Sequence, residues 1–460
     1  MKRKVCLVLT SIAYCWVPLQ ITAGPTVVPT AEGQIGEVLD AGNDNITGIS
    51  FESIRGQPGD ILFGGLVFLG GAPPGPPEFS FSTDEIHNDS NPVALGTTPA
   101  LFTSVTRLPP RSSWSRNAAD DGDFVAFAFA SDDLAANSMR IDVKVFNEVG
   151  QELSTPAIPN LVGFPDPAIN DLGVATDREG RVTVAYTELT QGQPTRVRAQ
   201  RFDGLTGLPI GGVIPVSDDG HAYPDVALLD PAGDLFMVPT SDFDHIRGNI
   251  VDVSGPTPVV MPEFSISTTP GFANFNPKVA ADPQTGISIV VWENLSAVPG
   301  NPADILGRRF DADGNELGPE FVVNTTTANA QGQPAVAVGP DGLTVVSWTS
   351  EPGVQGNELD VMAQVYGADG NPIGGEIQVN TETDGVQDKP AVRFLPESDS
   401  QGRPQFTVAW RDVNVGDGSL PNGTGTSYKC FSIEGLGDPT AIFADGFESG
   451  DTSSWSDQIP

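Results

Sequence analysis

Residues 277–324 and 334–380 are two copies of one pattern. The first reads PKVAADPQTGISIVVWENLSAVPGNPADILGRRFDADGNELGPEFVVN, and the second reads PAVAVGPDGLTVVSWTSEPGVQGNELDVMAQVYGADGNPIGGEIQVN. Each copy has four apolar runs. The first starts at a proline, the second ends in tryptophan, the third ends in an aromatic ring, and the fourth runs into an asparagine. A unit of this length with four short apolar runs is typical of one blade of a propeller.

The tryptophan-ended run recurs along the chain. Its last residues are Tyr186, Pro239, Trp292, Trp348 and Trp410, separated by 53, 53, 56 and 62 residues, and the last interval is long because residues 398–403 insert a polar loop. The runs RVTVAY, ISIVVW, LTVVSW and QFTVAW are β-branched and aromatic, which favours strand over helix.

Runs of this kind at residues 123–129, 181–186, 234–239, 287–292, 343–348 and 405–410 give six second strands. The segment before residue 84 supplies either a seventh blade or a strand that closes the ring. The sequence therefore predicts an all-β protein, a β-propeller of four-stranded antiparallel blades, with seven blades preferred over six.

The rings that end the second and third strands form the predicted core. With a side-chain period of two, each second-strand ring shares a face with the valine two residues before it, while the opposite face carries a small neighbour. Large faces that meet small faces of the next sheet would let the sheets interdigitate. The predicted core rings are Tyr186, Trp292, Trp348, Trp410, Phe202, Phe310 and Tyr366.

The two ends of the chain differ from the repeats. Residues 1–23 combine the basic Lys2, Arg3 and Lys4 with an apolar run and end at Ala23, which predicts a signal peptide and export. We expect residues 24–440 to form the propeller and residues 441–460 to form an acidic C-terminal tail. The protein is then secreted or held at the cell surface, in the periplasm or outside the cell. Of its three cysteines only Cys430 lies outside the signal peptide, so the mature chain cannot form an internal disulfide.

The chain is strongly acidic, with 23 Lys and Arg against 59 Asp and Glu and a formal net charge of −36. Such a surface repels nucleic acid and anionic lipid. No run after the signal peptide is apolar enough to span a membrane, so we expect no membrane insertion after its removal. The expected partner is an extracellular carbohydrate or protein.

Two groups of residues are candidate metal ligands. Asp311, Asp313 and Asn315 alternate oxygen-bearing side chains in a turn and could hold calcium, although a plain hairpin turn explains them as well. His221 and His245 each follow acidic residues, Asp242 and Asp244 in the second case. If consecutive blades bring both histidines to one rim, a mixed carboxylate–imidazole site results; loop histidines with acidic neighbours are the alternative. Apart from calcium, no cofactor is expected.

Motifs for nucleophilic catalysis and phosphate binding are missing: the sequence has no G-x-S-x-G elbow and no G-x-x-x-x-G-K-[ST] loop. The repeats resemble β-propeller-like arrays of exported bacterial proteins, in which a P-x-V-A strand, a V-V-W strand and an F-D-x-x-G hairpin recur; the likeness covers residues 168–410. Residues 444–455 (ADGFESGDTSSW) resemble a short C-terminal tail of exported Gram-negative proteins, which implies a role in sorting or surface retention.

These features lead to three functional hypotheses. The first is a non-enzymatic scaffold whose loops bind a carbohydrate, protein or matrix component. The alternative is a hydrolase or lyase that acts on extracellular polysaccharide with carboxylates in the funnel of the propeller. The third is a spacer of the cell envelope that binds no ligand.

Overall fold

The computed structural model describes strands and turns from residue 26 to residue 434. The described residues are 26–35, 45–55, 61–70, 79–85, 111–116, 123–133, 138–147, 152–161, 172–188, 194–217, 219–269, 273–298, 301–351, 359–381, 383, 385–395, 398, 402–413 and 424–434. The predicted signal peptide and the predicted acidic tail lie outside them.

The strands follow one another with a single short 3₁₀ turn, Pro340–Gly342, among the described residues. Those up to residue 161 are β1 (Thr26–Ile35), β2 (Asn45–Arg55), β3 (Ile61–Gly70), β4 (Phe79–Glu85), β5 (Arg111–Arg116), β6 (Asp123–Asp133), β7 (Ser138–Asn147), β8 (Glu152–Ser154) and β9 (Ala157–Leu161). Those of the middle part are β10 (Leu172–Thr176), β11 (Arg181–Glu188), β12 (Arg196–Asp203), β13 (Pro209–Pro215), β14 (Ala227–Leu228), β15 (Leu235–Ser241), β16 (Ile246–Asp252), β17 (Val259–Val260) and β18 (Phe264–Ser265).

The last part holds β19 (Ala273–Ala281), β20 (Ser288–Val298), β21 (Asn301–Phe310), β22 (Phe321–Val322), β23 (Gln331–Val338), β24 (Thr344–Ser350), β25 (Asp360–Tyr366), β26 (Pro372–Gln378), β27 (Val386–Phe394), β28 (Gln405–Val413) and β29 (Thr424–Glu434). In the described part of the chain no helix is long and apolar enough to cross a membrane.

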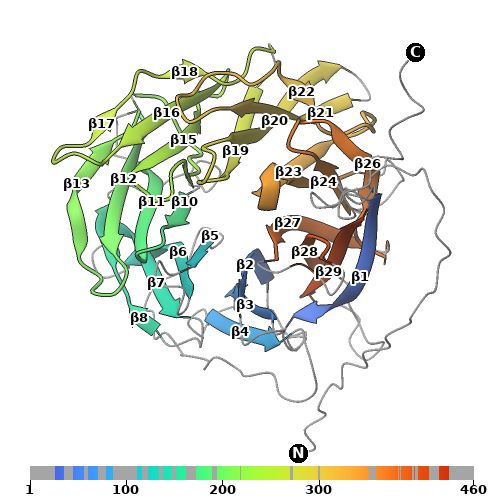
Figure 1. The fold of residues 1–460 in the computed structure, drawn as a ribbon, viewed down its shortest axis with the longest axis horizontal. Helices are drawn as coiled ribbons and strands as arrows, with labels where there is room; N and C mark the ends of the chain where they lie inside the picture. The colour runs from blue at the N-terminus through green and yellow to red at the C-terminus, as the bar shows by residue number, and fades with distance from the viewer. Residues whose placement is uncertain are drawn as a thin grey trace, which may run out of the picture.

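Seven antiparallel sheets stand around a common centre (Figure 1). Their strand orders are β2-β3-β4, β5-β6-β7-β8 with β9 beside β7, β10-β11-β12-β13, β14-β15-β16-β17 with β18 beside β16, β19-β20-β21-β22, β23-β24-β25-β26 and β27-β28-β29-β1. In six of the sheets the first strand lies nearest the centre of the ring; these strands are β2, β5, β10, β19, β23 and β27 (Figure 1). The fold is the predicted β-propeller, and seven sheets are counted in the described residues.

The ring is closed by the first and last strands of the chain. β1 pairs with β29 in antiparallel register, from Thr26 opposite Glu434 to Ile35 opposite Thr426. Sequence reasoning offered a closing strand and a seventh blade as alternatives for the segment before residue 84. The structure contains both, because β1 closes the ring and β2–β4 form a separate sheet. Closure of this kind gives the edge of β29 a partner.

The six predicted second strands lie in β6, β11, β15, β20, β24 and β28, each between two neighbours in its sheet. Their apolar residues contact the adjacent sheets on both faces. Trp348, for example, lies in one cluster with Ile289 and Val291 of the preceding sheet. Trp410 packs in the same way with Val345. All seven predicted core rings are buried, Trp292 and Trp348 completely. This large-on-small packing is what the two apolar faces of each second strand predict.

Repeated polar contacts fix the ends of the third and fourth strands. The side-chain oxygen of Asn324 accepts a hydrogen bond from the N–H of Ile305 at 2.7 Å, and Asn380 does the same for Val361 at 2.8 Å. In each case the amide nitrogen of the asparagine donates to the aspartate just before the third strand's apolar run, Asp304 or Asp360. The asparagine that ends each sequence repeat therefore satisfies backbone groups that would otherwise be buried without partners.

The inner strands of neighbouring sheets approach closely at Gly173. A Cβ atom at this position would lie 2.7 Å from backbone atoms of Asp225 and Val226. We expect Gly173→Ala to lower the free energy of unfolding by about 1–3 kcal/mol, because backbone cannot move aside as a side chain can. Chemical denaturation measures this, with Gly212→Ala as the control, since its Cβ would meet nothing within 4 Å. Equal stability of the two variants would contradict the packing described.

Candidate functional site

One face of the propeller carries the hairpins between second and third strands together with the beginnings of the inner strands. The turns between first and second strands, and between third and fourth, lie on the opposite face because the strands are antiparallel. On the first face the β15–β16 hairpin reaches the next sheet: the N–H of Asn274 donates to the carbonyl of Phe243 at 2.8 Å. We refer to this face as the hairpin face.

The inner strands share an unusual backbone feature near the hairpin face. The residue before the repeat proline has a positive φ in four consecutive sheets: Tyr223 (54°), Asn276 (52°), Gln333 (53°) and Lys389 (53°). In the last three sheets a register shift between first and second strands marks a β-bulge at the same place. Non-glycine residues in this conformation cost energy and occur often at functional sites. These four residues form an arc of strained backbone along the inner strands of four neighbouring sheets, which we call the strained arc.

Glu293 joins two of these bulges. Its Oε1 accepts hydrogen bonds from Asn276 Nδ2 and from the N–H of Gln333 in the next sheet, both at 2.8 Å. Burial raises the pKa of Glu293 above its ordinary value, and these two hydrogen bonds and the charge of Lys278 offset the effect only in part. A carboxyl that is buried and held in this way is a candidate for proton transfer.

Further hydrogen bonds link the next residues of the strained arc. The side-chain oxygen of Gln333 accepts hydrogen bonds from Thr349 and from the N–H of Lys389, both at 2.9 Å. Next to Lys389, the buried Asp388 binds Arg411 through both of its oxygens at 2.6 Å. The bulges at Asn276 and Gln333 are thus each tied to the following sheet, and Asp388 beside Lys389 is fixed by Arg411 within its own sheet.

The raised pKa of Glu293 predicts a dependence of stability on pH. A group whose pKa is higher in the folded state stabilises fully below its unfolded-state pKa, and this contribution is lost as pH rises through the folded-state pKa. Glu293→Gln keeps an oxygen for both hydrogen bonds but cannot ionise. Its stability relative to the natural protein should therefore increase as the pH rises above about 4.3, the ordinary pKa of a glutamate, toward the raised folded-state pKa. Denaturation at several pH values measures this, and the exposed Glu351→Gln controls for the loss of one negative charge. A constant difference across the range would refute the assignment.

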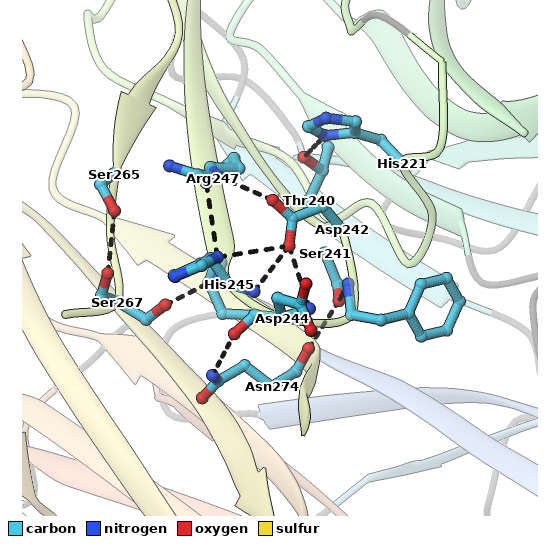
Figure 2. Close-up of polar contacts among 12 residues, drawn as sticks. His221, Thr240, Ser241, Asp242, Asp244, His245, Arg247, Ser265, Ser267 and Asn274 are labelled. Atoms are coloured by element: carbon cyan, nitrogen blue, oxygen red, sulfur yellow. Dashed lines mark hydrogen bonds and ion pairs between the residues drawn. The ribbon is translucent and has the colours of Figure 1, made fainter. Parts of the chain in front are cut away.

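A second feature lies at the outer part of the hairpin face, on the β14–β18 sheet. A chain of ionisable groups joins His221, Glu263, Arg247, Asp242 and His245. Figure 2 shows four of them, with Arg247 and Asp242 between the two histidines. His221 Nε2 lies 3.6 Å from Glu263 Oε2, Arg247 Nε lies 3.9 Å from Glu263 Oε1 and 2.9 Å from Asp242 Oδ2, and His245 Nδ1 lies 3.7 Å from Asp242 Oδ1. The two histidine contacts are ion pairs when the histidine is protonated. We call these five residues the ion-pair chain.

Asp242 is the best-anchored member of the ion-pair chain. Its Oδ1 accepts the N–H groups of Asp244 at 3.0 Å and His245 at 2.6 Å, and its Oδ2 accepts Arg247 Nε. Burial pushes the pKa of Asp242 upward, but the hydrogen bonds from Arg247 and from the backbone of His245, with the positive charge of Arg247, outweigh it and hold the pKa below its ordinary value. Asp242 is therefore a fixed, ionised hydrogen-bond acceptor.

The structure shows where the two histidines of the predicted metal site lie. His221 and His245 do lie on one rim, but both belong to the β14–β18 sheet and not to consecutive blades. Arg247 and Asp242 lie between them, and the guanidinium of Arg247 faces the carboxylates of Asp242 and Glu263 that a metal ion would need. Within the described residues no group of three His, Cys, Asp or Glu side chains could hold a metal ion. His221 Nδ1 contacts Thr240 Oγ1 at 2.9 Å instead.

The turn at Asp311, Asp313 and Asn315 has the geometry of a hairpin connection. Asp311 Oδ1 accepts the N–H groups of Asp313 and Asn315 at 3.0 and 2.8 Å, and its Oδ2 accepts Asn315 Nδ2 at 3.0 Å. Gly314 supplies the positive φ of 81° that the turn needs, as does Gly370 in the next sheet. Both oxygens of Asp311 accept hydrogen bonds within the turn, as the hairpin interpretation expects. The turn lies on the face opposite the hairpin face.

Sequence reasoning missed Glu263 and Arg247, although a signal for Glu263 was present. PEFSIS at residues 262–267 aligns with PEFVVN at 319–324, which places Glu263 at the position of Glu320. Glu320 accepts the N–H of Thr268 in the preceding sheet at 2.7 Å, and Glu376 binds Thr325 and Thr326 in the same way. In the β14–β18 sheet this repeated contact is replaced, because Glu263 faces His221 and Arg247.

No protein-family model matches the chain, and none of the curated proteins does. Among solved structures it is similar to a protein of unknown function from Dyadobacter fermentans, with 12% identity over 88% of this chain and 99% of that chain and a TM-score of 0.43. It is also similar to the Dos1 propeller, with 11% identity over 88% and 95% and a TM-score of 0.42. The α-L-arabinanase of Penicillium chrysogenum, complexed with arabinobiose, aligns at 12% identity over 87% and 98% with a TM-score of 0.40.

Proposed function

We propose that this protein is an exported, non-enzymatic β-propeller that binds an extracellular carbohydrate or protein through its hairpin face. The observation that carries the proposal is the ion-pair chain of the β14–β18 sheet. Its side chains range from the buried His221 to the half-exposed His245, and they hold one another in place before any ligand arrives. Groups that are already ordered lose little conformational entropy on binding, which favours recognition.

A matched pair of aspartates tests this proposal. Asp242 and Asp311 both accept backbone N–H groups in a turn and both have a lowered pKa through hydrogen bonds that outweigh burial, but they lie on opposite faces. Ligands are first found with a glycan array and by pull-down with the mature protein. Asp242→Asn should weaken binding of such a ligand by about tenfold, the loss of roughly one charge-assisted hydrogen bond. Asp311→Asn should leave it unchanged. The reverse pattern, or no ligand in either assay, would refute the proposal.

Glu293 favours a second candidate function, a hydrolase or lyase that acts on extracellular polysaccharide. Its burial and raised pKa suit a general acid that keeps its proton to a higher pH than an ordinary glutamate does. Incubation with a panel of polysaccharides, followed by an assay for new chain ends, tests this function. Turnover that is lost in Glu293→Gln would establish it and replace the non-enzymatic proposal, whereas turnover that persists in this variant would exclude Glu293 as the acid.

A further inference from the structure

An aromatic cluster lies beside the ion-pair chain. Phe243 is at the tip of the β15–β16 hairpin, Tyr223 is the strained residue before Pro224, and Phe275 belongs to β19 of the next sheet. The ring centroids of Tyr223 and Phe243 are 5.9 Å apart at 78°, and those of Tyr223 and Phe275 are 6.3 Å apart at 51°. Of the large hydrophobic side chains that are exposed in the described part of the chain, Phe243 is the only aromatic one, at 40% exposure.

The backbone of Phe243 is strained, and several bonds hold it in place. Its φ of 72° is rarely adopted by a residue with a bulky side chain. The N–H of Phe243 donates to Ser241 Oγ at 2.9 Å, while its carbonyl accepts the N–H of Asn274. Ser241 Oγ in turn donates to the carbonyl of Asn274 at 2.6 Å. Hydrogen bonds from two sheets therefore hold the backbone of Phe243 in an unfavourable conformation that leaves its ring exposed. This indicates a role for the ring beyond packing.

Polar groups suited to hydroxyls flank the ring. Asp244, the next residue, is exposed, and its carbonyl accepts Asn274 Nδ2 at 2.6 Å, which fixes its backbone. His245 is 43% exposed, and its Nδ1 lies 3.4 Å from Arg247 Nη2. A guanidinium only donates hydrogen bonds, so when His245 is neutral Nδ1 accepts in this contact and Nε2 carries the ring proton; a protonated His245 carries a proton on Nε2 as well. The carboxylate of Asp244 can accept hydrogen bonds, and Nε2–H of His245 can donate one.

We propose that Phe243, with Tyr223 and Phe275 behind it, stacks on the apolar face of a neutral sugar ring whose hydroxyls bind Asp244 and His245. This inference rests on the proposed function and names the ligand class of its site. The face of an aromatic ring is electron-rich and attracts the C–H groups of a sugar. Anionic saccharides are disfavoured because Asp242 and Asp244 are nearby and the whole chain has a net charge of −36.

Titration calorimetry with neutral and with acidic oligosaccharides tests the inference on the mature protein. We expect neutral oligosaccharides to bind, Phe243→Ala to weaken them about tenfold or more, and Phe243→Tyr to bind as the natural protein does. Leu208→Ala is the control, because Leu208 is 65% exposed in a turn on the opposite face. Saturation-transfer NMR on the natural protein needs no variant: irradiation of aromatic protons should reach the C–H protons of the sugar.

The outcomes separate this inference from the proposed function. Binding of neutral sugars that is unchanged in Phe243→Ala, binding of acidic sugars alone, or capture of a protein without any sugar would overturn the stacking site and leave a binding scaffold. The absence of any ligand would overturn both. Neutral-sugar binding that falls in Phe243→Ala, persists in Phe243→Tyr and gives saturation transfer would establish the site.

Discussion

A chain that lacks residues 26–35 should lose about 4–5 kcal/mol of unfolding free energy even if only half of the nine residue pairs between β1 and β29 contribute ~1 kcal/mol each. The loss should be large because β1 also covers part of the core: Val27 packs against the cluster that contains Phe431 and Ile433. Without β1, the edge of β29 is open to pairing with other chains. Chemical denaturation and light scattering measure the two effects.

The control for this deletion is a chain that begins at residue 24, which removes the predicted signal peptide but keeps β1. A synthetic peptide of residues 24–37, added to the shortened chain, should restore much of the stability. If the shortened chain were as stable and as soluble as the control, the ring would not depend on closure by its first strand.

Trp348→Ala is expected to lower the free energy of unfolding by about 3–5 kcal/mol. The ring is completely buried between two sheets, in the cluster that contains Val291 and Tyr366, and its Nε1 donates to Gln331 Oε1 at 3.0 Å. The substitution would leave a cavity at the contact between sheets and a buried amide oxygen without its donor.

Two further variants isolate these contributions. Trp348→Phe keeps most of the apolar contact and should cost about 1–3 kcal/mol, since it chiefly leaves the buried oxygen of Gln331 unsatisfied. Val322→Ala, at a side chain that is 51% exposed on the outer strand β22, should change stability by less than about 0.5 kcal/mol. A loss at Trp348→Ala no greater than that at Val322→Ala would show that the tryptophan is not part of the core.

The fold could be predicted because each second strand is apolar on both faces and recurs at a nearly constant interval. A sheet with two buried faces must lie between neighbours, and a closed ring provides neighbours for every copy. Positive φ angles could be predicted only where the residue is a glycine, as at Gly314 and Gly370. The positive φ of Asn276 and Gln333 was not, since residues before proline normally adopt extended conformations.

The candidate site was predicted only in part. The acidic surroundings of His221 and His245 pointed to the β15–β16 hairpin, but the partners of the two histidines depend on strand pairing. Arg247 meets Glu263 because β16 and β18 pair, with Arg247 opposite Ser265. Local sequence alone does not reveal this register, so sequence reasoning could not distinguish a metal site from an ion-pair chain. Phe243 was missed because a single aromatic residue in a loop has no periodic context.

The hairpin face differs from the opposite face in backbone strain and in aromatic exposure. Aspartates close turns on the opposite face, as Asp311 does, and Asp177 there also binds Arg181. On the hairpin face Asp242 closes a turn and binds Arg247, and in addition strained bulges tie neighbouring sheets together. An exposed aromatic ring is present there as well. This concentration of strain, charge and aromatic surface is why we place binding on the hairpin face.

Hydrogen–deuterium exchange in the presence and absence of a ligand found on the array tests that placement most directly. We predict slower exchange at residues 221–223, 241–247 and 273–276, with no change in the opposite turns at residues 177–180, 282–286 and 367–371. Protection confined to those opposite turns would contradict the account.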